Sequence, residues 1–186
     1  MIKPLLLASA LFASTVASAA NPVVEIRTNM GAMTLELYPD KAPETVKNFL
    51  GYVQSGFYDG TVFHRVIDGF MIQGGGFDTA LKQKPTRAPI KNEAANGLLN
   101  DKYTVAMART GEPHSATAQF FINVANNGFL NYRSPDERGY GYAVFGKVIK
   151  GQDVAARIAK VETGAVGPFP SDVPASAIVI EKATAK

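Results

Sequence analysis

Short strand-like segments separated by glycine, proline and asparagine constrain the fold of this 186-residue chain more than any other feature. Residues 23–28 and 32–38 alternate apolar and polar side chains around the sequence Asn-Met-Gly, which predicts a β-hairpin. Later segments of the same kind are rich in β-branched and aromatic residues, and they lie at 61–67, 70–74, 103–108, 118–124, 142–149 and 176–182. So many short strands predict a mainly β protein.

Two segments have the periodicity of an α-helix instead. In residues 42–57, Pro43 suits a first helical turn and Gly56 stands where a helix C-cap belongs. A second, shorter helix is expected at 153–160, and the longest loop is expected to run over the surface from 74 to about 98. Hydrophobic residues make up 46% of the chain, which is enough for one sizeable core. We therefore predict a closed antiparallel barrel capped by two helices.

The N-terminus has the composition of a secretory signal peptide. Lys3 provides a positive charge, residues 5–16 form a short apolar stretch, and Ala-Ser-Ala at 17–19 matches a cleavage site. The alternative is an N-terminal anchor or a first helix, but a membrane span needs about 20 apolar residues and this stretch is shorter. We predict that residues 1–19 are a cleaved signal peptide and that residues 20–186 form the folded domain.

The charge of the chain is a weak signal for a partner. Its formal net charge is +3 and its isoelectric point is about 9.1. One loose basic group, which consists of Lys82, Lys84, Arg87 and Lys91, is either a nucleic-acid-binding patch or a solvated loop. The scatter of the other basic residues favours the loop, so we predict no nucleic-acid partner. Because the sequence has no cysteine, we expect the exported protein to fold without disulfides.

The residues of conventional catalytic machinery are missing from the sequence. There is no cysteine to act as a thiol nucleophile and no G-x-S-x-G elbow. The two histidines, His64 and His114, have no second ligand at metal spacing, so we predict no metal site. The three glycines at 74–76 lack the Lys-Ser/Thr of a phosphate-binding loop. Carboxylate pairs for hydrolysis are not apparent either, and a conventional hydrolase is therefore not predicted.

The segment FHRVIDGFMIQGGG, residues 63–76, holds the most unusual charge of the chain, because it places Arg65 among apolar side chains. An arginine in such a setting is most often part of a structural ion pair, or it extends its charged head to solvent. Strand alternation puts His64 on the face opposite Arg65, where we expect a hydrogen-bonded packing histidine. His114 lies in a loop beside a proline and is expected to be exposed.

Three motifs in order carry a family resemblance. FHRVIDGFMIQGG, MARTGEPHSATAQFFI and YAVFGKVIKG are similar to segments of the cyclophilin-type peptidyl-prolyl isomerases, and the likeness extends over nearly all of residues 23–183. The resemblance implies an eight-stranded antiparallel β-barrel with two α-helices and a substrate groove on its outer face. It also implies that no metal or organic cofactor is needed, and since nothing in the sequence demands an oligomer, we expect a monomer. With its N-terminal segment, the chain is most similar to the periplasmic cyclophilins of Gram-negative bacteria.

The resemblance also assigns roles to single residues, with Arg65 as the catalytic arginine. Gln73 and Gln119 match the polar rim of the family's site, and we expect Gln73 to orient Arg65 through its carbonyl oxygen. Ala108 and Arg109 match the segment whose backbone runs along the substrate. The apolar residues that match the family's proline pocket are Phe70, Met71, Phe121 and Leu130.

Two positions depart from the family pattern. Phe129 stands where many members carry tryptophan, and Tyr142 stands where many carry histidine. Phe129 lacks the indole N–H, so the resemblance implies weak binding of cyclosporin, a cyclic peptide that occupies this pocket in many members. Taken singly, the apolar residues of the set would be core residues, and Gln119 would be an ordinary polar residue of a strand. The three motifs together favour the pocket.

We therefore predict an exported isomerase that acts on X-Pro bonds in unfolded or flexible proteins and so assists their folding. The alternative from another class is a peptide-binding chaperone or scaffold that uses the same groove without catalysis. Arg65 favours the enzyme, because a binding module has no need of a guanidinium that is costly to desolvate.

Overall fold

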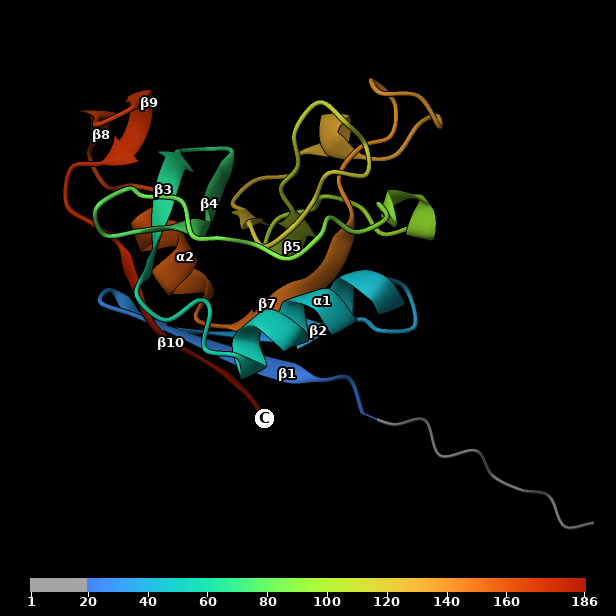
Figure 1. Cartoon of the computed structure of the whole chain (residues 1–186), viewed down its shortest axis with the longest axis horizontal. Coiled ribbons are helices and arrows are strands. Elements are labelled where there is room, and N and C mark those ends of the chain that lie inside the picture. The colour runs from blue at the N-terminus through green and yellow to red at the C-terminus, as the bar shows by residue number, and fades with distance from the viewer. Residues whose placement is uncertain (1–19) are drawn as a thin grey trace, which may run out of the picture.

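Eight strands close into an antiparallel barrel, as the sequence predicts (Figure 1). The computed structural model describes residues 20–186, so the predicted signal peptide at 1–19 lies outside the described residues. Around the barrel the strands follow the order β1-β10-β3-β4-β6-β5-β7-β2, and every neighbouring pair is antiparallel. Their bounds are β1 Val23–Thr28, β2 Gly31–Leu37, β3 Thr61–Ile67, β4 Met71–Asp78, β5 Thr104–Met107, β6 Phe120–Asn123, β7 Val144–Lys150 and β10 Val179–Ala185.

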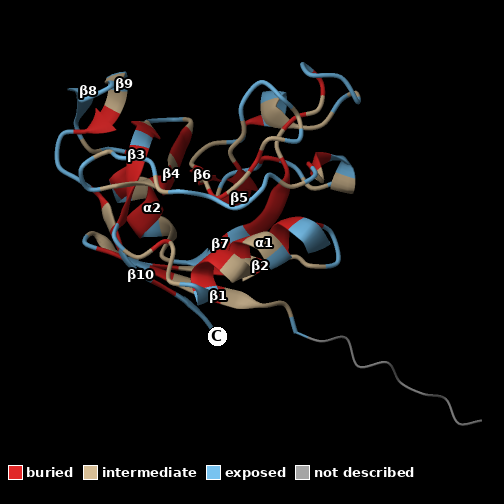
Figure 2. Cartoon of the chain, in the orientation of Figure 1, coloured by how far each residue is buried: buried red, intermediate tan, exposed pale blue. Residues whose placement is uncertain are grey.

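Both predicted helices are present, as α1 (Pro43–Gln54) and α2 (Gln152–Ile158). Pro43 opens α1, and Gly56 follows its C-cap with the left-handed φ of +66° that favours glycine, as predicted. Figure 2 shows that α1 has a buried face and an exposed face, which is the division expected of an amphipathic helix. Within residues 20–186, no helix is long and apolar enough to cross a membrane.

The barrel core fixes which residues of β6 point outward. The Phe120 ring packs edge-on against Phe49, Tyr58 and Phe63, with ring centroids 5.4, 5.4 and 5.9 Å away. All four side chains are fully buried, and each edge-to-face pair stabilises the fold by about 0.5–1.5 kcal/mol beyond simple burial. Because side chains alternate along a strand, an inward Phe120 directs the next residue, Phe121, to the outer wall.

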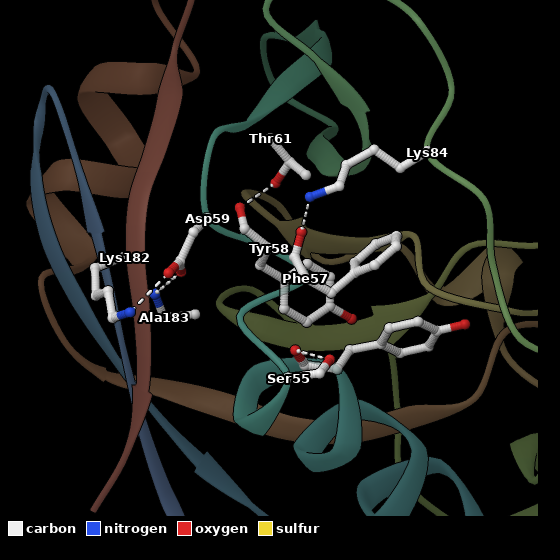
Figure 3. A network of polar contacts seen from close by, with 9 residues as sticks. Ser55, Phe57, Tyr58, Asp59, Thr61, Lys84, Lys182 and Ala183 are labelled. Atoms are coloured by element: carbon white, nitrogen blue, oxygen red, sulfur yellow. Dashed lines mark hydrogen bonds and ion pairs between the residues drawn. The ribbon is translucent and has the colours of Figure 1, made fainter.

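The turn that leads from α1 into β3 is fastened to the last strand (Figure 3). The Asp59 carboxylate accepts hydrogen bonds from Lys182 Nζ at 2.7 Å and from the backbone N–H of Ala183 at 3.1 Å. The Thr61 hydroxyl donates to the Tyr58 carbonyl at 2.6 Å. These contacts set where β3 begins, and β3 is the strand that carries Arg65.

The predicted basic group lies on a loop, as expected, and two of its members also make structural contacts. Lys84 Nζ donates to the Phe57 carbonyl and lies over the Phe57 ring, 4.7 Å from its centroid (Figure 3). The Arg87 guanidinium donates to the Gly51 carbonyl at 3.0 Å and lies 4.7 Å from the centre of the Tyr52 ring. Both cations therefore stabilise the C-terminal end of α1, where unpaired carbonyls favour positive charge. Lys82, Arg87 and Lys91 are exposed.

The long loop that was predicted to begin at residue 74 begins after β4, at residue 79. β4 continues through all three glycines to Asp78, and the glycines are buried. A Cβ on Gly74 would lie 2.9 Å from the Phe63 ring, and Gly75 has a φ of +80°. The glycines thus allow β4 to pack closely against the aromatic core while it remains a strand.

The C-terminal region differs most from the prediction. Residues 163–174 form a separate hairpin of β8 (Thr163–Val166) and β9 (Phe169–Pro174), where the glycine and proline content had predicted a loop. The last strand, β10, spans Val179–Ala185 rather than 176–182. In Figure 1 the hairpin stands beyond the end of the barrel near β3.

Candidate active site

A β-bulge brings Arg65 to the outer wall of the barrel. Phe63 pairs with Gly74 and Arg65 pairs with Gln73, so β3 contains one extra residue, His64, at this point. In a regular strand, Phe63 and Arg65 would share a face. With the bulge, Phe63 is in the core, and the Arg65 side chain lies outside with 45% of its surface exposed.

The same bulge overturns the prediction for His64. His64 lines the same pocket as Arg65 instead of facing away from it. It is buried, with 4% of its surface exposed, and within residues 20–186 its Nδ1 has no hydrogen-bond partner. His64 is therefore a buried packing histidine, as expected, but it faces the Arg65 pocket, and its Nδ1 lacks the expected hydrogen bond among residues 20–186. His114 is exposed as predicted, and its Nδ1 accepts a hydrogen bond from the backbone of Asn92 at 3.1 Å.

Strand pairing places the predicted site residues in one row. Arg65 pairs with Gln73, Gln73 with Phe121, and Phe121 with Ala106, across β3, β4, β6 and β5. Next to the guanidinium, an apolar cluster forms outside the barrel around Met71, Ala106, Phe121 and Val144. An apolar socket beside a permanent positive charge is therefore the main feature of this wall.

A pocket of about 570 Å³ lies on this wall. Every predicted site residue except Phe129 lines it, and these are Arg65, Phe70, Met71, Gln73, Ala108, Arg109, Gln119, Phe121, Leu130 and Tyr142. Phe129 follows in the 3₁₀ turn η2 (Gly128–Leu130), has 63% of its surface exposed, and stacks on Phe70 with 5.6 Å between ring centroids. It therefore borders the pocket at Phe70 without forming its lining.

The polar rim is built differently from the prediction for Gln73. The Gln73 amide nitrogen donates to the Gln119 side-chain oxygen at 2.9 Å. Among residues 20–186, no side-chain hydrogen bond joins Gln73 to Arg65, although the two residues pair along the strands, so the expected orienting contact is wrong. Gly76 makes room for this pair, because a Cβ there would lie 2.4 Å from Gln119 Cγ. The two amides form a rim of their own.

Arg109 is held firmly at the far wall of the pocket. Its Nε donates to the Gly141 carbonyl at 2.9 Å, and its Nη1 donates to the Thr110 and Gly111 carbonyls at 2.8 and 3.0 Å. Its guanidinium lies 4.7 Å from the centre of the Tyr142 ring. These contacts satisfy most of the Arg109 donors, and they fix the segment that passes along the pocket.

Three buried asparagines that the sequence analysis missed support the pocket from behind. Asn127 donates to the Phe70 carbonyl at 2.9 Å and to the Asn123 side chain at 2.7 Å. Asn123 donates to Asn100 at 3.2 Å, and Asn100 donates to the Leu130 carbonyl at 3.2 Å. The network thus connects the backbones of two pocket residues. The sequence signal for this network was Asn123, a polar residue at the buried end of the apolar strand β6, because a buried amide needs hydrogen-bond partners.

The β8–β9 hairpin, which the sequence analysis also missed, forms the remaining wall. Its residues Phe169, Pro170, Ser171 and Asp172 line the pocket. The His64 ring packs against both Phe77 and Phe169, with centroids 4.6 and 5.7 Å away. The pKa of His64 is lowered to about 4, mainly by burial; the Val62 backbone opposes this shift, and the adjacent Arg65 charge adds to it. His64 is therefore neutral at ordinary pH.

Within residues 20–186, no three histidine, cysteine, aspartate or glutamate side chains come together to hold a metal ion. The features that do come together, a guanidinium and an apolar socket on the outer wall of an eight-stranded barrel, define the class as cyclophilin-like. The family model described as cyclophilin type peptidyl-prolyl cis-trans isomerase/CLD matches residues 23–185. The chain therefore belongs to this family, and it is a peptidyl-prolyl cis-trans isomerase, as the motifs predict.

Similar proteins agree with this assignment. The chain is 61% identical to peptidyl-prolyl cis-trans isomerase cyp18 of Streptomyces antibioticus, over 86% of this chain and 96% of that protein. It is 56% identical to peptidyl-prolyl cis-trans isomerase B of Escherichia coli (strain K12), over 87% and 98%. A Cryptosporidium parvum cyclophilin type isomerase, crystallised in the presence of the dipeptide Ala-Pro, superposes with a TM-score of 0.71 at 27% identity, over 88% of this chain and 98% of that one.

Proposed function

We propose that this isomerase acts on X-Pro bonds in unfolded or flexible exported polypeptides, with Arg65 as its catalytic residue. One observation carries the proposal: the half-exposed Arg65 guanidinium lines the same pocket as the apolar cluster of Met71 and Phe121. The apolar cluster can hold a proline ring while the arginine reaches the peptide bond. The structural relative crystallised with Ala-Pro supports a substrate of this kind.

The energetic requirement suits such a site. Uncatalysed prolyl isomerisation takes tens to hundreds of seconds over a barrier of about 20 kcal/mol. Acceleration into the millisecond range needs about five decades, which corresponds to roughly 7 kcal/mol. No covalent bond forms or breaks, so neither a nucleophile nor an acid–base pair is needed.

Arg65 supplies part of this stabilisation. Rotation of the amide removes its resonance, and the prolyl nitrogen then becomes able to accept a hydrogen bond. The guanidinium is always charged and has five N–H donors. A single preorganised donor of this kind contributes about 3–4 kcal/mol in the transition state.

The apolar socket supplies the rest. A twisted amide is less charge-separated than a planar one, so a surrounding of low polarity favours it. Met71 and Phe121 are buried and offer no competing donors. With the proline ring fixed there, the preceding carbonyl can swing, and the Gln73–Gln119 rim can bind the flanking backbone.

Export and clients follow from the N-terminal pattern. Residues 1–19 have the features of a signal peptide, so we propose a periplasmic location and exported clients. We propose a monomer as well, because nothing in the sequence demands an oligomer. The pocket lies on the outer wall of the barrel, which suits extended segments of a larger chain. Cyclosporin is expected to bind weakly, because Phe129 has no N–H donor.

The test is the rate of cis-to-trans conversion of a tetrapeptide with one X-Pro bond. Arg65→Ala is expected to lower kcat/KM by about 10²–10³-fold with unchanged circular dichroism and melting, and Arg65→Lys to be partly active because an ammonium lacks the fork. Arg27→Ala is the matched control, since Arg27 is an exposed arginine of β1 with its own ion pair to Glu181. A folded Arg65→Ala protein with full activity would refute the assignment of Arg65.

A further inference from the structure

The β8–β9 hairpin places a carboxylate against Arg65. Asp172 lies on β9, and its Oδ2 is 3.8 Å from Arg65 Nε. Both side chains are partly exposed, at 34% and 45%, and both line the pocket. Within residues 20–186, Asp172 is the one carboxylate that forms an ion pair with Arg65.

The contact is made from one side of the guanidinium. Gln73, the expected partner of Arg65, donates to Gln119 instead. Asp172 faces the Nε atom, so the two Nη groups, which carry four of the five N–H donors, stay available for a bound peptide. An arginine side chain has many rotamers, and a fixed negative charge beside Nε lowers the entropy that is lost when the guanidinium is presented to a substrate.

The backbone conformation of Asp172 also indicates a functional role for this residue. Its φ is +65°, a left-handed conformation that is uncommon outside glycine and that aspartate and asparagine tolerate best. Such conformations persist where the surrounding structure holds them, and they concentrate at functional sites. Here the packing of Phe169 against His64 and Phe77 holds the hairpin on β3 and β4. The position of the carboxylate is therefore set by the fold.

We propose that Asp172 is a positioning residue that holds the Arg65 guanidinium for catalysis. The inference rests on the proposed function, because it requires Arg65 to act on the substrate. It adds the β8–β9 hairpin to the catalytic apparatus. Asp172 acts through Arg65 and not on the peptide, so its effect belongs to the transition state and should fall on kcat rather than KM.

Asp172→Asn is the decisive variant, because asparagine keeps the size and the left-handed backbone while it removes the charge. We expect kcat to fall about three- to fivefold at low ionic strength, as suits a partly exposed ion pair, with KM and melting temperature unchanged. In an Arg65→Ala background, assayed at raised enzyme concentration, the same change should alter kcat/KM by less than about twofold. Glu181→Gln is the matched control. Glu181 Oε2 forms an exposed ion pair with Arg27 Nε at a distance of 3.7 Å, and neither residue lines the pocket.

The outcomes separate the two proposals. If Arg65→Ala is fully active, the catalytic role of Arg65 is refuted, and the positioning role of Asp172 is refuted with it. If Arg65→Ala is impaired while Asp172→Asn equals the wild type, only the positioning role fails. An equal loss from Asp172→Asn with and without Arg65 would also overturn it, because a contribution independent of Arg65 is structural or belongs to substrate binding.

Discussion

Acidification should destabilise the protein through His64. Its buried ring packs against Phe77 and Phe169, its Nδ1 has no partner among residues 20–186, and it lines the pocket beside the Arg65 charge. Burial is the largest cause that lowers the pKa of His64 from 6.5 to about 4. Folding therefore makes this imidazole a weaker base, so the unfolded chain takes up the proton more readily.

The sign and the size follow from this difference. The stability that depends on neutral His64 is fully present above about pH 6.5, and it is lost as the pH falls toward 4. For a single group with these two pKa values, the loss between pH 7 and pH 5 is about 2 kcal/mol. Most carboxylates remain ionised over this interval, which makes it the best window for the measurement.

Urea unfolding of wild type and His64→Phe at several values between pH 7 and pH 5 provides the assay. Phenylalanine keeps the aromatic contacts and has no group to protonate, so this variant should lose about 2 kcal/mol less than the wild type over the interval. Parallel pH dependences for wild type and His64→Phe would refute the reasoning.

Two further predictions concern the pocket mouth and the N-terminus. Phe129 stacks on Phe70 at the edge of the pocket. A tryptophan there would donate its indole N–H to an acceptor of cyclosporin, which otherwise stays unpaired at a cost of roughly 1–3 kcal/mol. Phe129→Trp should therefore tighten cyclosporin inhibition at least about tenfold. An inhibition titration of both proteins measures this, and tight inhibition of the wild type would contradict it. The mature protein should begin at Ala20 in the soluble periplasmic fraction. Mass spectrometry that finds Met1 intact, or a protein held in membranes, would exclude signal cleavage.

Much of the fold was predictable because its elements carry local signals. The β1–β2 hairpin, with its alternation around a turn, and α1, with Pro43 and Gly56 at its ends, appear as predicted. The pocket set came from the order of three motifs, since no single residue distinguishes an outer-wall apolar residue such as Met71 from a core residue. Of that set, only Phe129 lies outside the lining.

The errors have one physical origin, which is that pairing between strands is not visible along the chain. The bulge at His64 depends on where β4 pairs with β3, and simple alternation therefore put His64 on the wrong face. Asp172 lies 107 positions after Arg65 in a glycine- and proline-rich segment, so its contact with Arg65 exists only once the hairpin is docked. Gln73 was given a plausible partner, but Gln119 is the one that β6 brings beside it.

The central claim is that Arg65 acts on the transition state of prolyl rotation rather than on substrate binding. Separate values of kcat and KM for wild type and Arg65→Ala, measured with the same proline tetrapeptide, test it most directly. We expect kcat to fall about 10²–10³-fold while KM stays within about a factor of two. A raised KM with an unchanged kcat would contradict it, because Arg65 would then bind the peptide without assisting its rotation.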